Sequence, residues 1–351
     1  MSARAALFGA IAVVLLVFYG IVGSRLSPVL VPGSTITPPP PKPSSAVPAP
    51  RVPGTIAFTL RGDIYVLRDG KYVNVTSEGR NLTPALSVDG RTLLFSRTET
   101  IDGRRSVDGQ VVPALLHYTD IIRKDSTGGT ETILVTGLKT KSAAGFHVVA
   151  YHDEPALAPD GSKFAIVTDF GDGNGSNLEV YDAKSTGSTP RRLALLSQGS
   201  ELADPSWSPD GKTIVVTSYT LGAPRLLVVP VDGRAAVPQK VGAEGEAYRA
   251  SYSSDGRWLI YTLRRPTGGN DVHAVEISSG RDIALTSDGK SWNGVFSPDG
   301  SQVAFLRETG GVIDVYAMEL GGALTGGTPK APVKLTNGEG IDGGSRPSWG
   351  G

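Results

Sequence analysis

Cysteine is absent from this chain of 351 residues, and histidine occurs only four times. The lack of cysteine excludes disulfides, thiolate metal sites, cysteine nucleophiles and the acylated cysteine of a bacterial lipoprotein. Neither charge is in excess, because 34 Lys and Arg residues balance 34 Asp and Glu residues. Without a strong field of one sign, we do not expect nucleic acid or an anionic membrane surface to be the main partner.

Long apolar runs are also scarce, and the one that stands out lies at residues 5–23, directly after Arg4. At about 1.5 Å per residue, a helix of this length approaches the hydrocarbon thickness of a bilayer. We expect residues 1–26 to form an uncleaved, single-pass signal anchor in the cell membrane, with the rest of the chain on the extracytoplasmic side. Alternatively, Ile21 and Gly23 mark the cleavage site of a signal peptide, and the protein is secreted.

A proline-rich segment follows the apolar run. Residues 27–53 contain ten prolines and few charges. Such a segment cannot bury enough apolar surface to fold, and it prefers extended polyproline II. We therefore expect a disordered linker that holds the next domain, residues 54–351, away from the membrane.

An internal repeat organises the chain after residue 53. Residues 205–211 have the sequence Pro-Ser-Trp-Ser-Pro-Asp-Gly, and related copies place their Asp at positions 89, 160, 210, 255 and 299. The intervals of 71, 50, 45 and 44 residues are close to the length of a propeller blade. Proline presets the first corner of a turn and glycine accepts the left-handed one, so each copy predicts a hairpin. Two further strands follow in each unit, which gives the four strands of a blade.

The two ends of the repeat region predict how the ring closes. Residues 346–349 match the start of the repeat and stop before its turn, whereas residues 55–58 match its second strand without the first. A blade assembled from both segments leaves no open sheet edge. We therefore predict an all-β, six-bladed β-propeller with four-stranded blades and a shared closing blade, preceded by one transmembrane helix and the proline-rich linker.

The motif at residues 205–211 resembles the repeat of the TolB-like propellers, and the resemblance covers residues 54–351. It implies a six-bladed propeller. The name-giving member of that family is a periplasmic component of a cell-envelope complex and binds protein partners, while other members bind saccharides or form the propeller of a peptidase. This chain departs from TolB in lacking the α/β domain that precedes the propeller there. The resemblance therefore implies the fold more strongly than any one function.

The loops that enter the innermost strands should converge on one mouth of the central channel. The residues at the start of each motif copy join acids and arginines to two aromatic rings, a set that suits a peptide terminus, a polar loop or a sugar. Alternatively, these acids and arginines pair with one another across the channel. The predicted binding residues are Asp153, Glu154, Asp204, Tyr248, Arg249, Trp292, Asn293 and Arg346.

Two connections between second and third strands should open on the same mouth. In the first blade this connection is swollen, over residues 97–118, and predicts a long loop that serves as a lid, a partner contact or mere decoration. In the next blade, Asp169, Asp172 and Asn174 give the loop the oxygen-rich character of a calcium site. It lacks the spacing of an EF-hand, so we favour a plain turn and expect no cofactor.

Catalytic signals are sparse. No Gly-x-Ser-x-Gly elbow occurs, and the one cluster suited to a metal or to acid–base chemistry, His147, His152, Asp153 and Glu154, has no recognised ligand spacing. We therefore predict a monomeric, non-enzymatic propeller that binds a protein or peptide at the cell envelope, with a saccharide as the other possible ligand. The alternative is a carbohydrate- or small-molecule-active hydrolase or lyase that uses Asp204 together with His152 and its acidic neighbours.

Overall fold

The computed structural model describes residues 52–169, 175–193, 201–220 and 222–351. Within these ranges the chain forms 26 β-strands and a single 3-10 helix, Ala323–Thr325. No helix of the described ranges is long and apolar enough to cross a bilayer. The predicted anchor, and the predicted linker up to residue 51, lie outside the described residues.

Six four-stranded antiparallel sheets contain all but two of these strands. Blade 1 consists of β4 (Asn81–Leu86), β5 (Thr92–Val107), β6 (Gln110–Asp125) and β7 (Gly128–Val135). Blade 2 consists of β10 (His152–Leu157), β11 (Lys163–Thr168), β12 (Asn177–Asp182) and β13 (Arg191–Leu193). Blade 3 consists of β14 (Leu202–Trp207), β15 (Thr213–Ser218), β16 (Arg225–Pro230) and β17 (Val237–Pro238).

The remaining three blades complete the ring. Blade 4 consists of β18 (Glu246–Tyr252), β19 (Trp258–Arg264), β20 (Asn270–Glu276) and β21 (Asp282–Ala284). Blade 5 consists of β22 (Ser291–Phe296), β23 (Gln302–Thr309), β24 (Val312–Glu319) and β25 (Val333–Lys334). The closing blade consists of β26 (Ser348–Gly350), β1 (Thr55–Leu60), β2 (Asp63–Arg68) and β3 (Lys71–Asn74), and the short pair β8 (Leu138–Thr140) and β9 (Val148–Val149) lies outside the blades.

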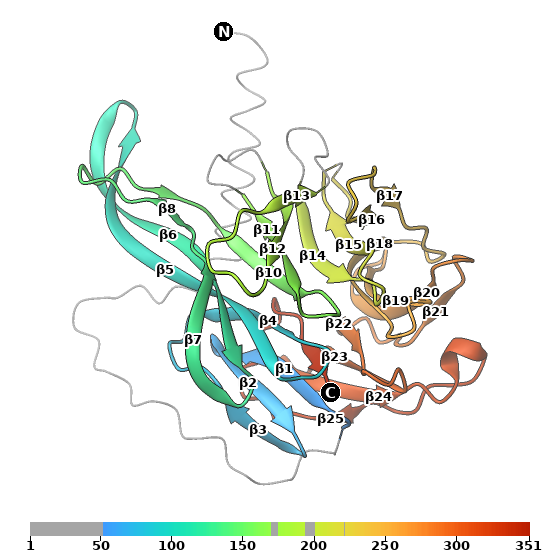
Figure 1. The fold of residues 1–351 in the computed structure, drawn as a ribbon. Coiled ribbons are helices and arrows are strands. Elements are labelled where there is room, and N and C mark those ends of the chain that lie inside the picture. The colour runs from blue at the N-terminus through green and yellow to red at the C-terminus, as the bar shows by residue number, and fades with distance from the viewer. Residues whose placement is uncertain (1–51, 170–174, 194–200, 221) are drawn as a thin grey trace. The chain divides into compact units, whose positions relative to one another are not determined.

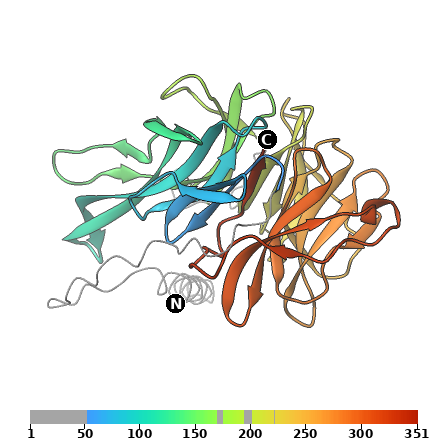
Figure 2. The same cartoon turned by 90° about the horizontal axis from the view of Figure 1, so that it is seen from below.

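The sheets are arranged as the blades of a propeller (Figures 1 and 2), and residues of all six blades line a central channel. Each innermost strand contacts the next, from β4 through β10, β14, β18 and β22 to β26, which contacts β4 again. In the closing blade, Ile56 of β1 pairs with Trp349 of β26, so strands from opposite ends of the described chain share one sheet. The predicted six blades and the shared closing blade are therefore confirmed.

The repeated motif folds into the predicted turn between the first and second strands of blades 1 to 5. In blade 3, the Ser208 hydroxyl donates to Asp210 at 2.7 Å and accepts from the Thr213 amide at 3.0 Å, while Asp210 accepts from the Lys212 amide. Gly211 adopts φ 69°, which favours glycine. The same side-chain bonds recur at Asp89, Asp255 and Asp299. We call the side of the propeller that carries these turns the turn face, and the opposite side, where each blade leads into the next, the loop face.

The apolar core consists of six clusters, one at each junction between neighbouring blades. The aromatic residue of the motif fills this layer: Trp207 and Phe296 are buried between blades, whereas Tyr252 and Trp349 are partly buried there. Trp207 also donates its indole N–H to the carbonyl of Ala156 in blade 2 at 2.9 Å. Because every blade packs on both neighbours, the ring positions all six innermost strands around the channel.

Blade 1 departs from the repeat through its long second and third strands. Each has 16 residues, and they remain paired from Thr92↔Asp125 to Val107↔Gln110. The predicted long loop over residues 97–118 is therefore wrong: this segment is a β-hairpin that rises from the loop face (Figure 1). Asp108 and Gly109 have φ 49° and 78°, the conformation of a two-residue hairpin turn, which the Asp-Gly sequence favours.

Candidate functional site

Five of the six innermost strands carry a β-bulge in the same place. The register shifts between Leu82 and Ala85 in blade 1, and at the equivalent positions of blades 2 to 5. One residue at each shift adopts a left-handed φ between 49° and 58°, which turns the strand locally and redirects its side chains. These residues are Thr83, Glu154, Asp204, Arg249 and Asn293. The equivalent residue of the closing blade, Arg346, precedes β26.

The bulge residues of blades 2 to 5 meet in a polar network that we call the neck. Asp204 accepts from the Thr217 hydroxyl at 2.9 Å and pairs with Arg249 at 3.2 Å. Arg249 in turn donates to the side-chain oxygen of Asn293 at 3.0 Å, and Glu154 accepts from the Asp204 amide at 2.5 Å. The structure thus brings together Glu154, Asp204, Arg249 and Asn293. They bond to one another across the channel, which is the second of the two arrangements expected from the sequence.

The neck leaves little free space, and its charges are nearly balanced. Its cavity, lined by Thr83, Glu154, Asp204 and Arg346, has a volume of about 20 Å³, close to the space that one water needs. Enclosure in the neck, with the carboxylates of Asp204 and Asp153 close by, raises the pKa of Glu154 well above its usual value. Asp204 is the carboxylate that pairs with Arg249, whereas Glu154 makes no ion pair among the described residues.

Asp153 fastens blade 2 to blade 1. Its carboxylate accepts from the hydroxyls of Thr83 at 2.8 Å and Ser96 at 2.7 Å, and from the Glu154 amide at 2.7 Å. With three donors on one oxygen, this side chain serves the junction between the two blades.

Hydrogen bonds engage the polar atoms of the two predicted aromatic residues. Trp292 packs against the apolar cluster between blade 5 and the closing blade, and donates its indole N–H to the Gly343 carbonyl at 2.9 Å. Tyr248 donates its hydroxyl to Asn270 at 2.9 Å. The neck has an aromatic neighbour that the sequence analysis missed, Tyr219, whose pKa is raised by burial and by Asp204. The sequence signal that could have identified Tyr219 was its position directly after β15.

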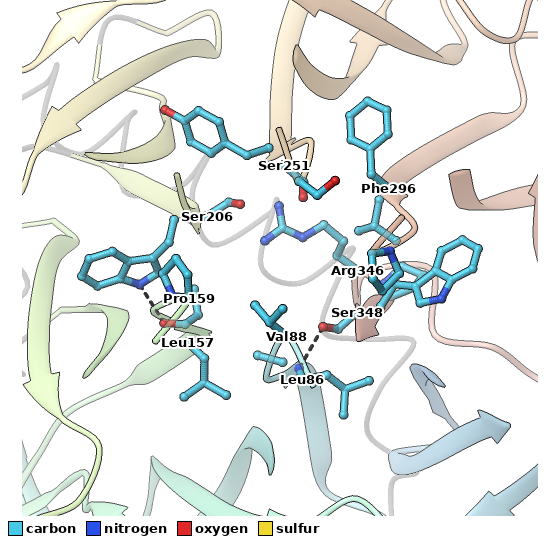
Figure 3. A pocket seen from close by; sticks show the side chains of 18 of the residues that line it. Leu86, Val88, Leu157, Pro159, Ser206, Ser251, Phe296, Arg346 and Ser348 are labelled. Atoms are coloured by element: carbon cyan, nitrogen blue, oxygen red, sulfur yellow. Dashed lines mark hydrogen bonds between the residues drawn. The ribbon is translucent and has the colours of Figure 1, made fainter. Parts of the chain in front are cut away.

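The wide opening of the channel lies on the turn face, opposite the predicted mouth. It is a pocket of about 400 Å³, which we call the funnel (Figure 3). Its wall consists of the small second residue of each motif copy, and its rim of the residue before each Asp of the turn. The wall residues are Ala85, Ala156, Ser206, Ser251, Val295 and Ser348, and the rim residues are Val88, Pro159, Pro209, Ser254 and Pro298.

Arg346 separates the funnel from the neck, because it lines both cavities. Figure 3 shows its side chain directed toward the middle of the pocket. The guanidinium donates to the carbonyls of Ala250 at 2.8 Å and Pro205 at 3.1 Å, on blades 4 and 3. Of the predicted binding residues, Arg346 is the one that lines the funnel.

A side groove continues the funnel over the turn face. A second pocket of about 210 Å³ lies between the turns of blades 2 and 3, and it shares Pro159, Trp207 and Pro209 with the funnel. Asp160 and Asp210 also line it. The repeated Pro of the turn sequence was the signal that could have directed attention to this face.

The histidine cluster does not assemble. His147 lies beside the blade 1 hairpin, where it accepts from the Ser142 amide and lies 3.2 Å from the Asp102 carbonyl oxygen. His152 is fully buried, and burial lowers its pKa to about 3. No group of three His, Asp or Glu side chains suited to a metal occurs among the described residues.

The oxygen-rich loop of blade 2 is described only in part. Asp172 and Asn174 lie outside the described residues, whereas Asp169 accepts from the Tyr151 amide at 2.8 Å.

Several relatives match parts of the chain. The Tol-Pal system protein TolB of Anaeromyxobacter dehalogenans (strain 2CP-C) is 36% identical over 96 residues, which are 27% of this chain and 21% of that protein. The uncharacterized peptidase YuxL of Bacillus subtilis (strain 168) is 31% identical over 173 residues, 47% of this chain and 24% of that protein. The chain thus matches less than a quarter of the length of either relative.

Solved structures share the fold at low identity. The crystal structure of TolB from Acinetobacter baumannii aligns with a TM-score of 0.60 and 20% identity, over 84% of this chain and 66% of that chain. A putative TolB from Agrobacterium tumefaciens aligns with a TM-score of 0.59 and 21% identity, over 84% of this chain and 92% of that chain. The family described as the TolB beta propeller domain matches residues 118–350, which is more than half of the chain. The chain therefore belongs to the TolB β-propeller family.

Proposed function

We propose that this chain is an extracytoplasmic binding module at the cell envelope, and that its funnel receives a peptide segment of a protein partner. The funnel carries the proposal: a volume of about 400 Å³ lies in the range of small-ligand sites. Its wall of small side chains and its rim of proline, valine and serine offer contact area with little side-chain entropy to lose. We further propose that residues 1–26 anchor the chain in the membrane and that residues 27–53 act as a spacer.

Two observations support this function. The relative from A. dehalogenans is a Tol-Pal system protein, which favours a partner within a protein assembly. In addition, the chain enters the propeller beside the funnel, because Trp349, which lines the funnel, donates its indole N–H to the Pro53 carbonyl at 2.6 Å. A tether that precedes Pro53 would therefore be attached on the funnel side.

Binding without turnover fits the chemistry of the site better than catalysis does. A hydrolase or lyase that uses His152 and the acids of the neck needs these groups around one substrate. The ring of His152 is buried, Asp204 is held by Arg249 and Thr217, and the neck cavity holds no more than about one water. No observation on the described residues favours the catalytic alternative.

A funnel-filling variant tests the proposal. Ser206 lies on the funnel wall between blades, and Ser206→Trp places a large ring in the opening (Figure 3). The matched control is Ser278→Trp, which adds the same ring to an exposed turn at the outer edge of blade 4. We would select binders for the full chain from a display library of linear peptides, and measure their affinity for both variants by isothermal titration calorimetry.

We expect Ser206→Trp to weaken these peptides by about 100-fold or more, and Ser278→Trp to bind them as the unchanged protein does. Thermal unfolding of both variants checks that the fold is retained. Equal binding by the two variants would place the peptide site elsewhere and refute the proposed function. Turnover of a saccharide panel by the unchanged protein would favour the enzyme instead.

A further inference from the structure

The floor of the funnel is formed by a guanidinium that main-chain carbonyls hold in place. Arg346 donates two N–H groups to the carbonyls of Ala250 in blade 4 and Pro205 in blade 3. Both blades lie across the channel from the closing blade, to which Arg346 belongs. A guanidinium has five donors, so these bonds fix its orientation and leave others for a ligand. Carbonyl oxygens carry no net charge and therefore do not neutralise it.

Arg346 has no carboxylate at ion-pair distance among the described residues. The nearby acids have other roles, since Asp204 pairs with Arg249, and Glu154 accepts from the Asp204 amide. Burial lowers the pKa of Arg346, which is the direction expected for a cation whose desolvation is incompletely compensated. Arg346, which reaches the funnel, therefore carries a charge that no directly bonded carboxylate of the described residues neutralises.

The remainder of the funnel is uncharged. Of the described residues that line it, Arg346 is the one with a charged side chain, among prolines, serines, small aliphatic residues and partly buried aromatics. A single charge at the base of an otherwise uncharged, concave site acts over a longer range than it would on an open surface, because the low-dielectric walls focus its field. The funnel therefore distinguishes between ligands mainly by the chemical group that each places beside Arg346.

We propose that the peptide received by the funnel presents a carboxylate to Arg346, either the free carboxylate of a chain end or an Asp or Glu side chain. This inference rests on the proposed function and names the chemistry of its ligand. A carboxylate matches the planar donor pattern of a guanidinium and makes charge-assisted hydrogen bonds to it. It also supplies the ion-pair partner that Arg346 lacks among the described residues, whereas an amide or hydroxyl in the same place would leave the cation unpaired.

Three libraries of N-acetylated random pentapeptides separate the two sources of the carboxylate. The first has free C-termini and contains no Asp or Glu, the second is C-terminally amidated and contains Asp and Glu, and the third is amidated and contains neither. Each is incubated with the full chain, and bound peptides are identified by mass spectrometry. We expect binders from the first library, the second or both, and their carboxamide counterparts to bind about 10- to 100-fold more weakly.

Variants assign the effect to Arg346. We expect Arg346→Met to lose the preference for the acid over the amide, and Arg346→Lys to keep part of it, because lysine retains the charge without the planar donor pattern. If Arg346→Met does not fold, Arg346→Lys still tests the role of the guanidinium. The comparison of the three libraries on the unchanged protein does not depend on any variant. Ser278→Trp is the control that should behave as the unchanged protein does.

The outcomes distinguish this inference from the proposed function. Equal capture of the third library, lost in Ser206→Trp, would retain peptide binding in the funnel and overturn the need for a carboxylate. Capture of no library would refute peptide binding itself, and the carboxylate with it. Preferential capture of a uronic-acid disaccharide over all three libraries would overturn the peptide as ligand.

Discussion

The two ends of the central channel are built from the same repeat and differ in almost every physical property. The neck, toward the loop face, consists of bulge residues that differ from blade to blade and bond to one another. The funnel, toward the turn face, consists of motif positions that stay small or apolar in every blade. The comparison indicates that the two ends have separate roles: the neck holds the blades in place around the channel, and the funnel remains open for a ligand.

The strongest test of that division is to remove the central acid of the neck. Asp204→Ala leaves Arg249 partly buried without its ion-pair partner and removes the acceptor of Thr217. Breaking a buried pair on one side typically costs roughly 3–5 kcal/mol, so we expect a loss of this size in the free energy of unfolding. Urea denaturation followed by tryptophan fluorescence measures it.

The control for this change is Asp232→Ala, which breaks an exposed pair with Arg234 in a surface turn. We expect no measurable shift in its unfolding midpoint, since exposed pairs contribute little. If the two variants unfolded at the same urea concentration, the neck would not be the structural half of the channel.

The loop-face end of β10 offers a second, pH-dependent test. His152 is fully buried, neither ring nitrogen has a hydrogen-bond partner among the described residues, and burial together with Lys139 lowers its pKa to about 3. As the pH falls, His152 is therefore protonated near pH 6.5 in the unfolded chain but only near pH 3 in the folded chain. The free energy of unfolding decreases as the pH falls between these two values.

Replacing this ring should remove the acid-sensitive step. We expect His152→Leu to change the free energy of unfolding little at pH 7, because it deletes no hydrogen bond of the ring. At pH 5 the free energy of unfolding of this variant, relative to that of the unchanged protein, should be about 2 kcal/mol higher than at pH 7. Urea denaturation at the two pH values measures this difference. Parallel loss of stability in both proteins would show that His152 is protonated in the folded state.

Glu154 should give a smaller effect of opposite sign. Its pKa is raised in the fold, so the folded chain holds a proton that the unfolded chain releases, and stability falls as the pH rises from about 4.5 through the folded pKa. By contrast, the Ser208 hydroxyl holds the pKa of Asp210, in a turn beside the funnel, below its usual range. Glu154→Gln keeps an oxygen to accept from the Asp204 amide, so its stability should decline less between pH 5 and 8 in thermal unfolding curves. A decline as steep as that of the unchanged protein would mean that Glu154 is ionised in the neck.

The fold was predictable because the blades repeat a short motif whose turn chemistry is local. Ser208, Asp210 and Gly211 specify their turn through bonds within six residues, and the same bonds recur along the chain. The split closing blade also followed, since residues 55–58 and 346–349 supply complementary parts of one sheet. The hairpin of blade 1 was missed, although its Asp108-Gly109 turn is a local signal of the same kind.

The site was only partly predictable, because a bulge changes which face a side chain occupies. Counting back from the motif found Glu154, Asp204, Arg249 and Asn293, which do meet. The residue before the bulge, Trp292, instead packs between blades. Which end of the channel is open depends on side-chain volumes summed over six blades, and no single segment of sequence carries that information.

The smallest effect is expected from the hairpin of blade 1, which rises from the loop face and should be independent of the funnel. Replacing residues 101–116 by a two-residue Asn-Gly turn joins Thr100 to His117, which already pair directly. We expect peptide affinity of the funnel to change by less than about twofold, since no residue of the removed segment lines it. Hydrogen exchange should quicken only near Gly145, whose carbonyl accepts from the Arg104 amide. A tenfold loss of affinity in this variant would instead show that the two ends of the channel are coupled. A change in contacts at the loop face would then alter, through the neck, the position of Arg346 in the funnel.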